Sequence, residues 1–118
     1  MRNILTVITV LFAIACSSPN KIPDDVLSID KMKPIVWDMM RAGVLAQNLS
    51  GIDTVKLRKQ SESKYQEVFS VYGITKDEFY NSYQYYVEHP DKQKILLDSV
   101  VSYANRKRMV LFETMHAQ

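Results

Sequence analysis

Apolar side chains recur at helical spacing in four segments of the chain, and this pattern sets the expected fold. The first segment follows Ser28, a residue type that caps helix N-termini, and carries Trp37 on the flank of its apolar stripe. The residues of the stripe are Ile29, Met32, Val36, Met39, Met40 and Gly43. Pro34 lies past the first turn and removes a backbone donor, so we expect the helix to kink there or to begin near it.

The second and third segments are separated by the clearest local signal in the sequence. Gly73 suits the left-handed stop of one helix, and Thr75 with Glu78 matches a capping box at the start of the next. The second helix follows a loop predicted at residues 49–53, and its stripe contains Leu57, Ser61, Tyr65, Val68, Phe69 and Tyr72. The third helix, predicted over residues 76–88, groups Phe79, Tyr80, Tyr83, Tyr86 and Val87. Tyr85 is predicted to point away from that group.

A fourth helical segment begins at the corner made by His89 and Pro90. The residue before a proline avoids the helical region, whereas proline itself suits the first helical position. The segment continues beyond residue 110, and its predicted inward side chains are Leu96, Leu97, Val100, Ala104 and Leu111. No segment alternates in the manner of a strand. The sequence therefore predicts an all-α fold, a small compact bundle of three to four amphipathic helices in a domain over residues 28–118.

Residues 1–15 have the features of a secretory signal peptide. Arg2 follows the amino terminus, and residues 4–14 form an uncharged run of eleven residues. As a helix this run would be about 16 Å long, about half of the ~30 Å hydrocarbon thickness of a bilayer. It is therefore too short to span a membrane and suits the hydrophobic region of a signal peptide.

The uncharged run leads to Cys16, the single cysteine of the chain. Ala13 and Ala15 fit an ordinary cleavage site, and residues 13–16 also resemble a bacterial lipobox, with Ala13 where leucine is usual. We predict that Cys16 is lipidated, which would attach the mature protein to a membrane without a transmembrane helix. The alternative is a freely secreted protein with an incidental cysteine. Residues 16–27, which include Pro19 and Pro23, are predicted to form the lipidated cysteine and a short tether.

The order of residues in the helical domain resembles a known family. Its most specific part is the run from Gly73 to Pro90. The matching residues are Gly73-Ile74-Thr75, Phe79, Ser82, Tyr85-Tyr86 and His89-Pro90, with Leu27-Ser28, Met32, Trp37-Asp38 and Leu97-Asp98-Ser99 outside that run. Together they are similar to domain-of-unknown-function family 4296, small lipoproteins of Bacteroidota, over about residues 22–101. The resemblance implies an all-helical lipoprotein and assigns no activity or catalytic residue.

The resemblance also implies a location. Surface-exposed lipoproteins of that phylum often carry acidic residues directly after the lipidated cysteine, whereas this chain has Ser17-Ser18-Pro19-Asn20. The resemblance therefore implies an anchor in the outer membrane that faces the periplasm.

The composition argues against several classes of function. The 15 basic and 13 acidic residues nearly cancel, so nothing favours binding to nucleic acid. One cysteine and two histidines leave no ligand set at metal-binding spacing, and the three glycines are too isolated for a phosphate-binding loop. We therefore predict that the protein is not an enzyme and has no catalytic residue, metal site or cofactor.

Aromatic and basic residues are the candidates for contacts with a partner. Tyr85, with His89 and the adjoining corner, would form a docking patch if it points outward, and Trp37 is a further aromatic candidate. The alternative is that these side chains pack into the core. The basic run Arg106–Arg108 suits either anionic lipid headgroups or the charge preference of a helix C-terminus.

The leading hypothesis from the sequence is an envelope lipoprotein that acts as a membrane-tethered, helical protein-interaction module. Lipid on Cys16 would hold it at the membrane, and an unidentified envelope protein would be its partner. Two alternatives stay open: an enzyme whose catalytic residues form no recognisable motif, and a carrier that holds an apolar ligand between its methionine- and tyrosine-rich faces.

Overall fold

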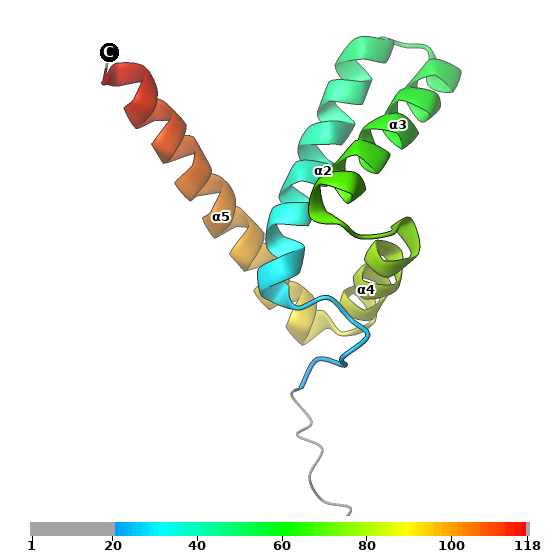
Figure 1. The fold of residues 1–118 in the computed structure, drawn as a ribbon, viewed down its shortest axis with the longest axis vertical. Coiled ribbons are helices and arrows are strands. Elements are labelled where there is room, and N and C mark those ends of the chain that lie inside the picture. The colour runs from blue at the N-terminus through cyan, green and yellow to red at the C-terminus, as the bar shows by residue number, and fades with distance from the viewer. Residues whose placement is uncertain (1–20, 118) are drawn as a thin grey trace, which may run out of the picture.

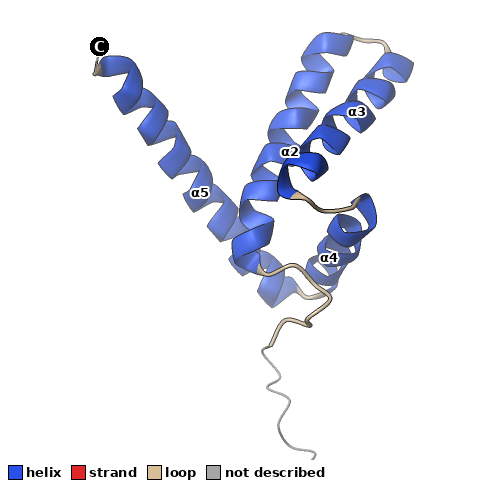
Figure 2. Cartoon of the chain, viewed as in Figure 1, coloured by secondary structure: helices blue, strands red, loops and turns tan. Residues whose placement is uncertain are grey.

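The computed structural model describes residues 21–117, and this part of the chain is almost entirely helical (Figure 1). Its four helices are α2 (Ile29–Ser50), α3 (Thr54–Tyr72), α4 (Lys76–Glu88) and α5 (Pro90–His116). Figure 2 shows short loops between the helices and no strand among the described residues. The prediction of an all-α bundle is therefore confirmed, and the signal peptide and Cys16 lie outside the described residues.

Local capping explains where the helices begin. The Asp53 carboxylate accepts a hydrogen bond from the Lys56 backbone N–H at 2.9 Å and caps α3. At the start of α4, the Thr75 hydroxyl accepts from the Glu78 backbone N–H while the Glu78 carboxylate accepts from the Thr75 N–H. This reciprocal arrangement is the capping box that the sequence predicted. Pro90 is the first residue of α5, where its missing N–H costs no helical bond.

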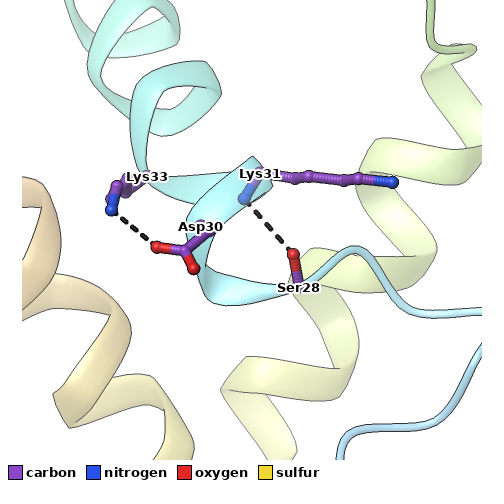
Figure 3. A network of polar contacts seen from close by, with 4 residues as sticks. All are labelled: Ser28, Asp30, Lys31 and Lys33. Atoms are coloured by element: carbon purple, nitrogen blue, oxygen red, sulfur yellow. Dashed lines mark hydrogen bonds and ion pairs between the residues drawn. The ribbon is translucent and has the colours of Figure 1, made fainter.

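The start of α2 is held by polar contacts on either side of its first turn (Figure 3). Ser28 caps the helix by accepting from the Lys31 N–H at 3.4 Å. The Lys33 ammonium donates to the Asp30 carboxylate at 2.6 Å, and this hydrogen bond and charge lower the pKa of Asp30. Because the helix begins at Ile29 and continues through Pro34, the expectation of a later start near the proline is wrong.

Small residues in the second half of α2, toward Ser50, let α3 pack closely against it. Ala42, Ala46 and Ser50, spaced four residues apart, are buried on this face. A Cβ atom at Gly43 would lie 3.2 Å from the Tyr65 hydroxyl of α3. The side chains that α2 presents to α3 are therefore short, and the two helices form an antiparallel hairpin.

The core lies at one end of this hairpin, which we call the base. Side chains from all four helices meet there: Met32, Ile35, Val36, Phe69, Phe79, Tyr86, Leu96 and Val100. The predicted inward stripes of the helices supply most of these residues. Met40, which the sequence placed on the inward stripe of α2, is exposed because it lies beyond the part of α2 that meets the base.

The last part of α5, residues 105–116, projects away from the hairpin, and we call it the arm (Figure 1). In the inner half of α5, Leu96, Val100 and Ala104 are buried. The prediction that Leu97 and Leu111 also face the core is wrong, because they are 47% and 61% exposed. Only the base of the molecule is therefore as compact as the sequence predicted.

Candidate functional site

The segment that leads into the fold is fixed to α4 at Leu27. The Leu27 N–H donates a hydrogen bond to the Ser82 hydroxyl at 2.9 Å, and the Tyr86 hydroxyl donates to the Leu27 carbonyl at 2.8 Å. Ser82 and Tyr86 are one helical turn apart on α4, so they reach the same backbone residue from one face. We call these three residues the clamp.

Both side chains of the clamp are fully buried, which raises the cost of losing either bond. Burial is the main cause that raises the pKa of Tyr86 to about 12, so the phenol stays a hydrogen-bond donor into alkaline solution. Neither Ser82 nor Tyr86 is predicted from the amino-acid sequence to hold this segment. The available signal was a serine on the apolar stripe of α4, between Phe79 and Tyr86.

The predicted patch residues Tyr85 and His89 do lie together. Their rings stack with centroids 4.0 Å apart, and His89 Nδ1 lies 2.6 Å from the Tyr85 carbonyl oxygen. The same local arrangement recurs at the end of α5, where His116 stacks on Phe112 and contacts its carbonyl. In both places the histidine contacts the carbonyl four residues earlier, and such a contact satisfies a carbonyl that the end of a helix leaves free. The ring pair of Tyr85 and His89 therefore does not by itself indicate a binding site.

The orientation predicted for the tyrosines of α4 is partly wrong. Tyr85 is half-buried and packs against the core, whereas Tyr80 and Tyr83 are exposed. Trp37 is half-buried against the same core from α2. No ring contact joins Trp37 to Tyr85 or His89 among the aromatic pairs of the described residues. Of the three predicted patch residues, Trp37 and Tyr85 therefore pack against one core, and the exposed His89 joins them only through its ring contact with Tyr85.

A second tyrosine, which is half-buried, joins the two helices of the hairpin. The Tyr72 hydroxyl donates to the Asp38 carboxylate at 2.6 Å, and Arg41 pairs with the same carboxylate at 3.4 Å. Burial first, and then the Asp38 hydrogen bond and charge, raise the pKa of Tyr72. A phenol held in its protonated form beside a paired carboxylate serves as a structural donor, so this contact explains packing and implies no acid–base chemistry.

Metal and membrane-spanning features are absent from the described part of the chain. Within residues 21–117, no three histidine, cysteine or acidic side chains cluster as metal ligands would. The same search region contains no helix with the length and apolar character needed to cross a bilayer.

A dense group of exposed apolar side chains lies on the arm. Met109, Val110, Leu111, Phe112 and Met115 are each more than half exposed. The basic residues Arg106, Lys107 and Arg108 precede them, and none of the three takes part in the ion pairs of the described residues. Lys107 instead lies over the Tyr103 ring, 5.4 Å from its centroid. A soluble domain rarely exposes so many neighbouring apolar residues unless another surface covers them.

The hollows between neighbouring helices do not match the predicted apolar carrier. A groove between α3 and α4 is lined by residues that include Tyr65, Phe69 and Tyr80, but its volume of about 220 Å³ is below the ~300–1,000 Å³ typical of sites for small molecules. A hollow between α2 and α3 is larger, about 470 Å³, but its lining contains no methionine or tyrosine and includes four charged residues, Asp38, Arg41, Lys64 and Glu67. Neither hollow therefore favours the apolar-carrier alternative.

Comparison with known proteins identifies the family of the chain. No curated protein and no solved structure matches it. The model of the family described as Domain of unknown function (DUF4296) matches residues 23–109. This match covers more than half of the chain and includes the Gly73–Pro90 run on which the resemblance was based. The chain therefore belongs to the DUF4296 family.

Proposed function

We propose that the protein is a lipid-anchored, helical interaction module of the bacterial envelope. Lipid on Cys16 would hold it to the periplasmic face of the outer membrane, and the helical domain would bind an envelope protein. The module would act by binding and not by catalysis.

One observation carries the binding part of the proposal. The arm exposes five large apolar side chains on a helix whose inner half is anchored in the core. The rigid continuation of α5 out of the base presents these residues at little further cost in conformational entropy, because the helix is already ordered. A protein surface with an apolar centre and acidic groups would complement the arm and its basic residues Arg106, Lys107 and Arg108.

The position of the clamp supports an anchored orientation. The described chain starts beside the base, and α5 ends on the far side of the molecule (Figure 1). Since Leu27 is bonded through both its N–H and its carbonyl, the tether would join the folded domain at a fixed point. A lipid on Cys16 would then leave the arm directed away from the membrane and accessible to a partner.

Site-specific photo-crosslinking in cells tests the binding proposal. A photo-reactive residue at Phe112 of the arm should give adducts with an envelope protein, which mass spectrometry would identify. The same residue at Val71, an exposed apolar position on α3, is the matched control. Recovery of no protein other than a second copy of the chain at Phe112, or identical adducts at both positions, would contradict the proposal.

Lipidation is tested separately. Labelled palmitate should enter the wild-type chain and should not enter a Cys16→Ala variant. Equal labelling of the two proteins, or a wild-type protein found free in the periplasm, would remove the anchor from the proposal.

A further inference from the structure

The groove between α3 and α4 is small for a free ligand but matches the size of one aromatic ring. Its volume is about 220 Å³. For comparison, an apolar cavity of about 150 Å³ inside a protein is enough to hold a benzene molecule. The groove is partly open to solvent, so a ring can enter it while the chain that carries the ring stays outside. The volume therefore indicates a site for a single side chain of a larger molecule.

Aromatic residues line the inner part of the groove. Tyr65 and Phe69 are one helical turn apart on α3, and Tyr80 comes from α4. The Phe69 and Tyr80 rings are nearly perpendicular, with centroids 6.4 Å apart. Phe69 is buried, whereas Tyr80 is 43% exposed. A further ring placed here would extend a series of edge-to-face contacts, an arrangement that aromatic pairs favour.

The lining residues are held in place before any ligand enters. Phe79, a core residue, packs its ring 5.2 Å from that of Tyr80. The Tyr65 hydroxyl extends to α2, where it lies close to Gly43. The capping box fixes the first turn of α4, which carries Lys76. Because these residues are already ordered, binding a ring costs little conformational entropy.

The charged residues of the groove favour an acidic group beside that ring. Arg58 and Lys76 line the groove together with a single acid, Glu62. The Lys76 ammonium lies 3.8 Å from the Glu62 carboxylate, and both side chains are more than half exposed. Arg58 takes part in none of the ion pairs of the described residues. The groove therefore carries a net positive charge, which complements a carboxylate.

We propose that the groove between α3 and α4 binds one aromatic side chain of a partner peptide, with an acidic residue of the peptide beside it. The ring packs against Phe69 and Tyr80, and the carboxylate pairs with Arg58. A neutral sugar also stacks on aromatic rings, but it gains nothing from the positive charge, so the charge favours the peptide. This site lies on α3 and α4 and not on the arm. It therefore goes beyond the proposed function and does not depend on it.

Titration of short peptides into the isotope-labelled full chain tests the proposal. The probe is an acetylated and amidated tripeptide with phenylalanine between two aspartates, and amide chemical shifts of the protein measure its binding. A dissociation constant of about 1 mM is expected, with the largest shift changes at Tyr65, Phe69 and Tyr80. Replacing the phenylalanine by alanine should abolish binding. Replacing the aspartates by lysines should weaken binding about five-fold, which is the effect of one exposed ion pair.

Two pairs of variants locate the site on the chain. Ser61→Phe fills the groove from its half-buried lining and should weaken binding of the phenylalanine peptide by a factor of about ten. Ser63→Phe, at an exposed position of α3 outside the lining, is the matched control. Arg58→Glu should weaken binding about five-fold. Lys59→Glu makes the same change in net charge outside the lining and should have a smaller effect. Both basic residues are exposed, so neither variant should disturb the fold.

The outcomes that overturn the proposal are equally specific. They include a folded wild-type chain without saturable shift changes in the groove, and an alanine peptide that binds as well as the phenylalanine peptide. Equal binding by Ser61→Phe and Ser63→Phe, or by Arg58→Glu and Lys59→Glu, would also overturn it. Tighter binding of a neutral oligosaccharide, with maltotriose as the probe, would replace the peptide by a glycan.

The groove and the arm can fail independently. Shift changes confined to the arm would refute the groove site and leave the proposed function intact. Shift changes in the groove, together with an absence of adducts at Phe112 in cells, would support the groove site and contradict the proposed function.

Discussion

The two halves of α5 share one helix but have different surroundings. Leu96 in the inner half is 1% exposed, whereas Leu111 in the arm is 61% exposed. Both are leucines in the same regular backbone, so the difference arises from what lies beside them and not from helix formation. The inner half gains stability by burying apolar surface against α2 and α4, and the arm keeps its apolar surface available for another molecule.

The strongest test of this comparison removes the same side chain from each half. Leu96→Ala should lower the free energy of unfolding by about 2–5 kcal/mol, because it leaves a cavity in the core. Leu111→Ala should lower it by less than about 0.5 kcal/mol when the chain is monomeric. Urea denaturation at low protein concentration measures both values. Equal losses would show that the arm is packed against the chain in solution.

A smaller loss is expected from breaking the clamp. Ser82→Ala removes the acceptor of the Leu27 N–H in a fully buried setting, and should cost about 1–3 kcal/mol. Ser102→Ala on the exposed side of α5 is the control and should be close to neutral. Hydrogen exchange at the Leu27 amide should accelerate in the first variant and not in the second. Unchanged exchange in Ser82→Ala would remove the clamp from the description of the base.

A third test compares two threonines, one in the base and one in the arm. Thr75→Ala breaks the capping box of α4 and should cost about 1 kcal/mol. Thr114→Ala removes only an exposed bond from its hydroxyl to the Leu111 carbonyl, so little change is expected. Thermal unfolding followed by circular dichroism measures both. A larger effect at Thr114 would contradict the assignment of the arm as a region that adds little stability.

The smallest of the expected effects on stability comes from tyrosine ionisation, because it is absent at neutral pH and appears only in alkaline solution. The pKa of Tyr86 is raised to about 12 in the folded protein, above its value of ~10 in an unfolded chain. Its contribution to stability is therefore complete below pH ~10 and is lost as the pH rises through the folded pKa. Tyr86→Phe should reduce this alkaline decline, and Tyr83→Phe, at an exposed position, should not. Equal pH dependence in all three proteins would contradict the assignment.

The features predicted correctly from the sequence are those that depend on neighbouring residues. Thr75 and Glu78 specify their capping box within one helical turn, and Pro90 marks the corner into α5. Phe79 and Tyr86 were placed inward by helical spacing, and both are buried. The same spacing misplaced Tyr85 and Leu97, because periodicity finds an apolar face without showing how many neighbouring helices will cover it.

The amino-acid sequence by itself determined that the described chain forms four helices and where several of them begin, since capping and helical spacing act over a few residues. The tertiary structure decided that Leu27 is held by Ser82 and Tyr86, residues more than fifty positions away. It also decided that the inner half of α5 is buried while the arm is exposed. These outcomes depend on the angle at which separate helices cross, and no local pattern specifies that angle.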